Sequence, residues 1–294
     1  MHHDDIASLP MIYYEKMMAN YQSHENLKIT PENVFQEGIR HNYDLFMELV
    51  DTLMLPGSGV NGAENLLETV SLLKKGKSVL FLMKHLGNFD VPCFYSLLSR
   101  EGAQYQSILD RLVFIAGRKL NEESPIVKTF TEVFSRLIVV PNREIPQKTD
   151  HETHEQKARR KAVVKEATRI NRAALRMLMD LKKQGYIIVL FPMGGRPKPW
   201  LNETNNGVKE TTSYMRLFDW VHFIGMTGNL IPVGDEMKDE KPRQDTIIFT
   251  VSEPIPAEAY LEESRRLFKR QTDTDDFDQF NVNRVMKAIG QFDP

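Results

Sequence analysis

The sequence has almost no cysteine, no long apolar run and no excess of either charge. Its 294 residues include a single cysteine, Cys93, which excludes an internal disulfide framework and a cysteine-rich zinc module. There are 38 Lys and Arg against 40 Asp and Glu, a net charge of −2, so the chain as a whole is not built to coat nucleic acid. We therefore expect neither a disulfide-stabilised protein nor a nucleic-acid-binding one.

The apolar runs are also too short to form a transmembrane helix. The longest of them, residues 79–83 and 186–191, are far shorter than the roughly 20 residues that cross a bilayer. The N-terminus carries acidic residues where a secretory signal has a basic region. With 41% hydrophobic and 27% charged residues, the composition is that of an ordinary folded protein. We expect a cytoplasmic location, with any membrane association peripheral.

The first part of the chain has helical periodicity. Apolar residues recur every three or four positions from Thr30 to Leu53, and Pro31 stands where a helix tolerates proline. A Pro-Gly-Ser-Gly stretch then breaks the pattern, Asn61 is a candidate cap for a second helix, and Gly76 ends it. We expect residues 1–76 to form a small all-helical N-terminal domain and residues 77–294 to form a second domain.

After Gly76 the period changes to that of strands. Short β-branched and apolar runs occur at residues 78–83, 112–116, 137–140, 186–191, 230–233 and 246–251, with helical stretches between several of them. This alternation predicts an α/β fold with a mixed, largely parallel sheet covered by helices. In such sheets ligands bind beyond the carboxyl ends of the strands, so we look there for a functional site.

A histidine and an aspartate follow the first of these runs. His85 comes directly after it, and Asp90 stands five residues on. On one continuous helix the two would lie about 140° apart, so they meet only across a tight turn, for which Gly87 and Asn88 are suitable. An aspartate that accepts from one imidazole nitrogen leaves the other free to take a proton from a hydroxyl. We predict a general-base pair; the alternative is a histidine that merely caps a strand or helix.

Basic residues follow three other predicted strands. One of these strand ends also carries two adjacent glycines, whose backbone N–H groups can approach an anion closely. The alternative is a plain Gly-Pro loop with solvent-exposed cations. Because carboxyl ends of parallel strands share one edge of a sheet, these groups and the His–Asp pair together suit a phosphorylated alcohol as substrate. The predicted phosphate and oxyanion residues are Arg118, Lys119, Arg143, Gly194, Gly195, Arg196 and Lys198.

Residues 157–183 form the one charge anomaly. Ten Lys or Arg stand there against Glu166 and Asp180, a local net charge of 10 − 2 = +8. Apolar residues at helical spacing predict an amphipathic helix from about Glu155 to Gln184 with its basic residues outside. Two interpretations stay open: a plain solvated face, or a dock for an acidic protein or an anionic membrane surface.

Four blocks of the sequence stand in the order and approximate spacing of the four motifs of glycerolipid acyltransferases. They are His85-x4-Asp90, residues 114–119, residues 191–196 and residues 230–233. Within that family the chain most resembles the soluble, plastid-type glycerol-3-phosphate 1-O-acyltransferases. Met193 stands where the commonest third motif has Glu; the plastid type lacks that Glu as well. In the second block the plastid type has an acidic residue before its Arg, whereas here Arg118 and Lys119 are adjacent.

The resemblance implies transfer of a fatty acyl group from an acyl carrier protein or coenzyme A thioester to the 1-hydroxyl of glycerol 3-phosphate, in phospholipid biosynthesis. His85 would be the base, Asp90 its orienter, and the basic residues above the phosphate ligands. It implies no metal or other cofactor. Two alternatives remain: an acyltransferase with a lysophospholipid or another alcohol as acceptor, and a non-catalytic lipid- or phosphate-binding protein on the same scaffold.

Overall fold

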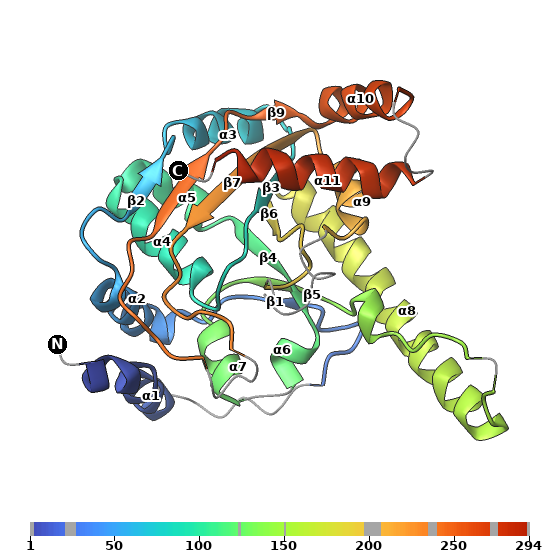
Figure 1. The fold of residues 1–294 in the computed structure, drawn as a ribbon, viewed down its shortest axis with the longest axis horizontal. Helices are drawn as coiled ribbons and strands as arrows, with labels where there is room; N and C mark the ends of the chain where they lie inside the picture. Colours follow the sequence, from blue (N-terminus) through green and yellow to red (C-terminus); the bar gives the residue numbers. More distant parts are fainter. Residues whose placement is uncertain are drawn as a thin grey trace.

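The computed structural model describes residues 3–20, 28–122, 125–149, 151–196, 207–234, 240–270 and 276–292. Helices cover both faces of one sheet (Figure 1). The strands are β1 (Phe35–Gln36), β2 (Gly59–Asn61), β3 (Val79–Met83), β4 (Leu112–Gly117), β5 (Arg136–Val139), β6 (Ile187–Leu190), β7 (Trp220–Thr227), β8 (Ile248–Val251) and β9 (Ile255–Pro256).

The helices alternate with these strands over most of the chain. The α-helices are α1 (His3–Ala19), α2 (Tyr43–Leu53), α3 (Asn65–Lys74), α4 (Asp90–Arg100), α5 (Gln106–Leu109), α6 (Lys119–Glu122), α7 (Pro125–Thr131), α8 (His154–Lys183), α9 (Glu210–Met215), α10 (Ala257–Phe268) and α11 (Phe277–Gly290). Short 3-10 turns are η1 (Arg40–Asn42), η2 (Ala103–Tyr105) and η3 (Asn142–Glu144). Among the described helices, none is both long and apolar enough to cross a bilayer.

The sheet is mixed and largely parallel, which confirms the predicted fold class. Its order is β1-β5-β4-β6-β3-β7-β8-β2, and β9 pairs with β7. The central strands β5, β4, β6, β3 and β7 are all parallel, whereas β1, β8 and β9 pair antiparallel with their neighbours. The carboxyl ends of those five central strands therefore lie at one edge, which we call the carboxyl edge.

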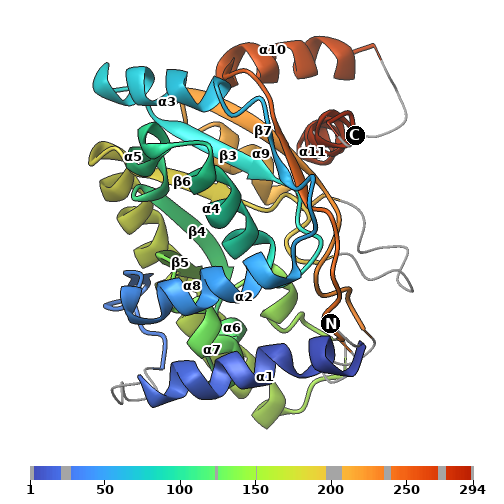
Figure 2. The ribbon, with the colours of Figure 1, turned by 90° about the vertical axis from the view of Figure 1, so that its left-hand side faces the viewer.

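Two hydrophobic layers hold the helices to the sheet. Strand β3 shows why: its residues are all buried, and alternate side chains face opposite ways, so that Phe81 joins one layer while Leu80 and Leu82 join the other. The first layer packs against α1, α2 and α4, which Figures 1 and 2 show on one side of the sheet. The second packs against α8, α10 and α11 on the other side.

The all-helical interpretation of residues 30–61 is wrong in two places. Residues 35–36 form β1 and pair with β5, and residues 59–61 form β2 and pair with β8. Two- and three-residue strands are too short to show a period of two. The Asn33 side chain accepts from the Thr30 N–H at 2.7 Å and closes a turn there, so the helix begins only at Tyr43. A domain boundary at residue 76 stays a prediction; α1 and α2 share their hydrophobic layer with the sheet.

The strand predicted at residues 230–233 is also corrected. The strand lies earlier, at β7, and residues 230–233 form an irregular segment instead. The Asn229 side chain accepts from the Ile231 N–H at 3.0 Å, and Pro232 has no N–H that could donate a hydrogen bond to a neighbouring strand. The β7 pattern was missed because His222 and Gly225 interrupt its apolar run.

His222 is buried inside β7 and serves the fold. Its Nε2 lies 2.9 Å from the Thr69 hydroxyl, and its Nδ1 lies 2.9 Å from the Ser252 carbonyl oxygen. Burial lowers the pKa of His222 to about 4. Because both nitrogens have partners and the ring is neutral, this histidine is a structural group.

The pKa of His222 makes stability depend on pH. The unfolded chain binds a proton at His222 below about pH 6.5 while the folded chain stays neutral down to about pH 4, so stability is full above pH 6.5 and falls as the pH drops through that window. Between pH 7 and pH 5 we expect wild type to lose about 2 kcal/mol more unfolding free energy than His222→Gln, which keeps a polar side chain there. Urea unfolding at the two pH values measures this; equal losses would contradict it.

Candidate active site

The structure brings His85 and Asp90 into direct contact at the carboxyl edge. His85 lies two residues beyond β3, and Asp90 is the first residue of α4. His85 Nδ1 lies 2.8 Å from Asp90 Oδ2. Between them the chain makes the tight turn that the five-residue spacing requires. The ring is thus oriented by a carboxylate, and when Nδ1 carries the hydrogen, Nε2 is left as a base.

Asp90 is buried, and its charge is compensated by N–H groups. It is 1% exposed. Its Oδ2 accepts from the Leu86 N–H at 2.6 Å, and both its oxygens accept from the Gly87 N–H at 3.0 Å. Together with His85, three N–H groups therefore face this carboxylate, which also stands at the N-terminus of α4, where a negative charge is favoured. The turn and the imidazole are held by the same side chain.

The His85 ring is fixed from its face as well as from its edge. It stacks on Phe191, with ring centroids 4.2 Å apart and planes at 21°, and its side chain is 18% exposed. Nε2 has no hydrogen-bond partner among the described residues. Phe191 begins the loop after β6, so the stack also connects the His–Asp turn to the glycine-containing loop of the next strand.

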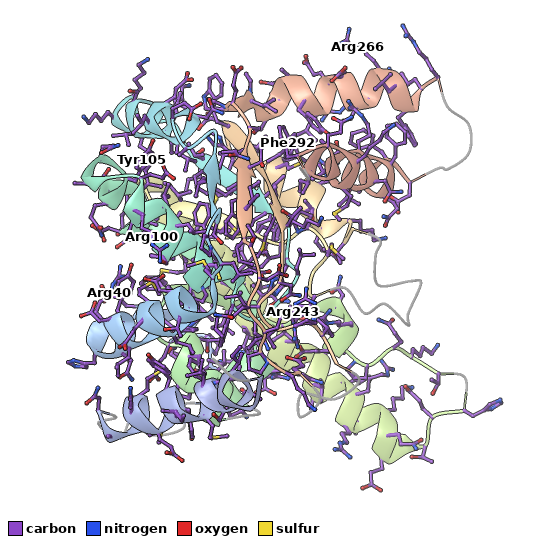
Figure 3. The ribbon with its side chains drawn as sticks, turned by 60° about the vertical axis from the view of Figure 1, so that its left-hand side comes forward. Arg40, Arg100, Tyr105, Arg243, Arg266 and Phe292 are labelled. Atoms are coloured by element: carbon purple, nitrogen blue, oxygen red, sulfur yellow. The ribbon has the colours of Figure 1, made fainter. Side chains whose placement is uncertain are left out.

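Gly87 is required by close packing and not by its φ angle. A Cβ at this position would lie 2.3 Å from Asn229 Oδ1 and 3.0 Å from the Ile231 carbonyl oxygen. Asn229 donates through Nδ2 to the Leu86 carbonyl oxygen at 2.8 Å. Its own carbonyl oxygen accepts from Arg243 Nε at 3.0 Å. Arg243, which is labelled in Figure 3, also pairs with Asp245. The segment after β7 therefore locks the turn in place.

The loop after β6 carries the two glycines that are predicted to bind an oxyanion. Gly194 has φ +66°, and its N–H is already bonded to the Phe191 carbonyl oxygen at 2.8 Å. The Gly195 N–H has no partner among the described residues. A Cβ at Gly195 would lie 3.1 Å from Arg143 Nη1, so the Arg143 guanidinium packs directly on this loop. Among the described residues, therefore, the Gly194 N–H is already bonded and the Gly195 N–H is not.

Arg196 is connected to the His–Asp turn through a residue that the sequence did not reveal. Its Nη1 lies 2.6 Å from Glu240 Oε1, and the other oxygen of Glu240 accepts from Asn88 Nδ2 at 3.0 Å. The Glu240 side chain is only 4% exposed. Asn88 belongs to the turn itself, so one buried carboxylate joins a predicted phosphate ligand to the loop that carries His85.

The remaining predicted cations are less closely connected. Arg118 follows β4 directly, and its Nε lies 3.7 Å from Glu122 Oε2. That Nε is buried and has no hydrogen-bond partner among the described residues. Lys119 begins α6 and is exposed. Lys198 lies outside the described residues. Among the described residues, no hydrogen bond or ion pair joins Arg118 to the His–Asp turn.

Cys93 is the one cysteine of the chain and lies close to the His–Asp turn. Cys93 lies in α4, one turn from Asp90, and is fully enclosed. Burial raises the pKa of its thiol well above the usual range, and the Asp90 carboxylate raises it further, so a thiolate is disfavoured. Within the described ranges, no group of three or more His, Cys, Asp or Glu side chains is placed to hold a metal ion.

Comparison with known proteins finds similar solved structures. No family model matches the chain, and no curated protein matches it in sequence. The structure is similar to the crystal structure of PlsC, the 1-acyl-sn-glycerophosphate (LPA) acyltransferase from Thermotoga maritima. The TM-score is 0.49 and the sequence identity 12%, over 99% of this chain and 97% of the other. A likeness at this level says nothing about chemistry, which must be argued from the site.

The packing of Gly87 makes a testable prediction. Gly87→Ala pushes a Cβ into Asn229 and the Ile231 backbone, and we expect a loss of about 1–3 kcal/mol of unfolding free energy, because backbone cannot move aside cheaply. Gly59→Ala is the matched control, since a Cβ there meets nothing within 4 Å. Urea unfolding of both variants checks this. If Gly87→Ala were as stable as Gly59→Ala, the turn would not be locked as described.

Proposed function

We propose that the protein is an acyltransferase of the glycerolipid type, which moves an acyl group from a thioester to the hydroxyl of a phosphate-bearing alcohol, glycerol 3-phosphate in the first instance. One observation carries the proposal. His85 is oriented by a buried carboxylate, keeps Nε2 without a partner among the described residues, and stands at the same strand edge as the Gly195 N–H and the Arg143 and Arg196 guanidinium groups.

The chemistry requires one general base and no covalent intermediate on the protein. Nε2 of His85 takes the proton of the acceptor hydroxyl as its oxygen attacks the thioester carbonyl, and Asp90 stabilises the imidazolium that forms. The Gly195 N–H is suited to the negative oxygen of the tetrahedral intermediate. When the C–S bond breaks, the imidazolium returns its proton to the leaving thiolate. An ester and a free thiol result, and the base is regenerated.

The phosphate of the acceptor would be bound by guanidinium groups. Arg143 packs against the loop that contains Gly194 and Gly195, and Arg196 is the residue directly after Gly195. A planar guanidinium group can donate two parallel hydrogen bonds to two oxygens of one phosphate. Arg118 and Lys119 at the end of β4, and Lys198, are further candidates. In this structure Arg196 is neutralised by Glu240, so an incoming phosphate shares Arg196 with that carboxylate.

His85→Ala tests the catalytic role. We expect kcat for acyl transfer to glycerol 3-phosphate to fall by at least about 100-fold, because the acceptor hydroxyl loses its proton acceptor. His41→Ala, at an exposed histidine of η1, is the control and should keep wild-type kcat. The assay follows a labelled acyl group from acyl carrier protein and coenzyme A thioesters. Transfer at the wild-type rate in His85→Ala would end the catalytic assignment.

The acceptor is settled by the same assay with other alcohols. The panel includes a 1-acyl-sn-glycerophosphate, which is the acceptor named for the Thermotoga maritima enzyme, and glycerol without phosphate. Preference for the acylated phosphate would replace glycerol 3-phosphate in the proposal while keeping the mechanism. Wild-type protein that transfers to no acceptor, yet binds one of them, would favour the non-catalytic binding protein.

Arg196 makes a separate prediction about the phosphate. Because removing Arg196 alone leaves the buried Glu240 charge without its partner, the double variant R196Q/E240Q removes both charges together. We expect its KM for the phosphorylated acceptor to rise about tenfold or more, while kcat changes little. Arg216→Gln, which removes an exposed arginine paired with Asp278, is the control and should leave KM unchanged. An unchanged KM in R196Q/E240Q would exclude Arg196 as a phosphate ligand.

A further inference from the structure

The outer face of α8 carries a straight row of exposed cations. At 100° per residue, six of its Lys and Arg fall within about 120° of the helix circumference. The side chains of the helix that are buried in the core lie on the opposite side. We call the row the basic stripe: Lys157, Lys161, Lys165, Arg169, Arg172 and Arg176, all exposed.

The basic stripe contributes no hydrogen bond or ion pair to the described part of the protein. Of the other four cations of α8, Arg160 pairs with Glu152 at 2.6 Å, Lys182 donates to the Leu217 carbonyl oxygen and Lys183 lies 3.8 Å from Asp180, whereas Arg159 is exposed outside the stripe. None of the six stripe side chains forms a hydrogen bond or an ion pair with a described residue. Apart from that of Arg169, which acts on the neighbouring Glu32 carboxylate, their charge is available to a partner, in a chain whose total charge is −2.

Part of α8 extends past the carboxyl edge of the sheet. Asn171 exchanges two hydrogen bonds with the backbone of Val140, at 2.8 and 2.9 Å, and so lies level with the end of β5. Residues 154–170 continue beyond that point for about 25 Å, at 1.5 Å per residue. Figure 1 shows this part of α8 projecting from the body. We call it the α8 arm. The α8 arm projects beyond the carboxyl edge, the edge at which His85 lies.

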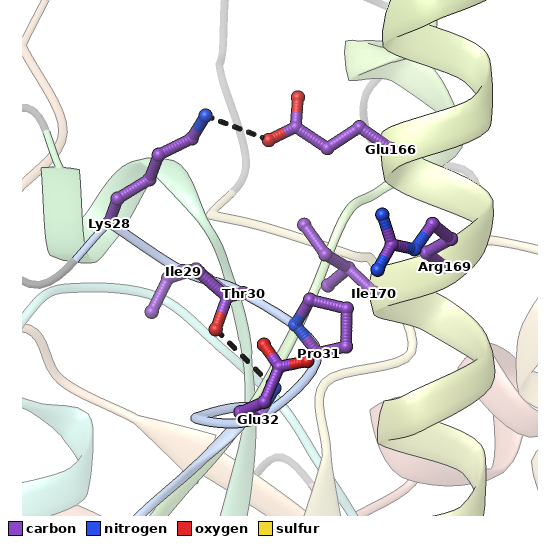
Figure 4. Close-up of a pocket in the computed structure, with 8 residues that line it drawn as sticks. All are labelled: Lys28, Ile29, Thr30, Pro31, Glu32, Glu166, Arg169 and Ile170. Atoms are coloured by element: carbon purple, nitrogen blue, oxygen red, sulfur yellow. Dashed lines mark hydrogen bonds and ion pairs between the residues drawn. The ribbon is translucent and has the colours of Figure 1, made fainter.

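The stripe borders concave surface at the base of the arm. A depression of about 230 Å³ lies between Arg169 of α8 and the turn at Thr30 and Pro31 (Figure 4). A second depression, of about 240 Å³, shares Pro31 and Arg169 with the first and is also lined by Arg172 and Arg176. Arginines of the stripe therefore line both depressions.

These features favour a folded acidic protein over a bilayer as the occupant. A helix that binds a membrane surface buries an apolar face in it, but the apolar face of α8 is already buried in the core. Among the exposed large hydrophobic residues of the described chain, Leu175 alone belongs to α8. Positive charge beside shaped recesses is complementary to a protein with acidic side chains on a convex surface.

We infer that the basic stripe docks an acidic protein that carries the acyl thioester, and that this donor protein lies along the α8 arm so that its thioester reaches the carboxyl edge near His85. The inference rests on the proposed function, which supplies the thioester. A coenzyme A thioester is too small to span a stripe about 29 Å long, so the stripe discriminates between the two kinds of donor.

Charge reversal on the arm tests the docking surface. In Lys161→Glu/Lys165→Glu we expect the KM for an acyl carrier protein thioester to rise about tenfold or more, with kcat unchanged and the KM for the matching coenzyme A thioester unchanged. The difference from wild type should shrink at high salt. Lys74→Glu/Lys75→Glu, two exposed lysines that precede β3 at the opposite edge, is the matched control and should behave as wild type. Circular dichroism confirms that both variants fold.

A direct binding measurement separates this inference from the proposed function. Holo acyl carrier protein is titrated onto wild type and both double variants, which requires no turnover. Weaker binding to the arm variant alone supports the docking surface even if no acyl transfer is seen, in which case only the proposed function fails. Unchanged carrier binding, an equal rise in KM for both thioesters, or lost binding to phosphatidylserine vesicles with unchanged carrier binding would each overturn the inference.

Discussion

The site depends on one buried carboxylate. Asp90 is enclosed, and an isolated charge in such a place would cost far more than a fold can supply, so three N–H groups face it. Two of them belong to the backbone of the turn and the third to the imidazole. The same bonds that make the burial of Asp90 tolerable therefore also set the path of the chain and the orientation of the ring. Structure and chemistry cannot be changed separately here.

Distant segments complete the arrangement. The parallel strands bring several loops to one edge, where side chains join them: Phe191 lies on His85, Asn229 binds Leu86, and Glu240 lies between Asn88 and Arg196. Each of these contacts comes from a different part of the chain. The His–Asp turn is thus held by the neighbouring loops, in keeping with the need of a catalytic group for a rigid surround.

The sequence predicts what local patterns encode. Strands β3, β4 and β6 are continuous apolar runs, and α8 has a regular stripe with a capping box at Thr153 and Gln156, so both kinds of element were predictable. Strand β7 was not, because its buried His222 is polar in sequence and becomes acceptable only through Thr69 and Ser252, which lie far away along the chain.

The candidate site also has a part that the sequence predicts and a part that only the tertiary structure reveals. His85 and Asp90 could be predicted as a pair because they are five residues apart in the sequence and directly follow a predicted strand. Gly87 was expected to serve a turn, but its need for hydrogen in place of a side chain comes from Asn229. Glu240 had no pattern at all around it, since its partners Asn88 and Arg196 belong to other loops. Contacts between loops are decided by tertiary packing, which no local spacing records.

The two outermost strands of the sheet both come from the beginning of the chain. β1 covers β5 at one margin, and β2 covers β8 at the other, where Gly59 pairs with Ile248 from near the far end of the chain. Without these short strands, β5 and β8 would present unpaired backbone groups to other molecules, which invites intermolecular strand addition. By covering both margins of the sheet, β1 and β2 protect it against intermolecular strand pairing. Strand β2 can pair only after β8 has been synthesised, because β8 lies near the end of the chain.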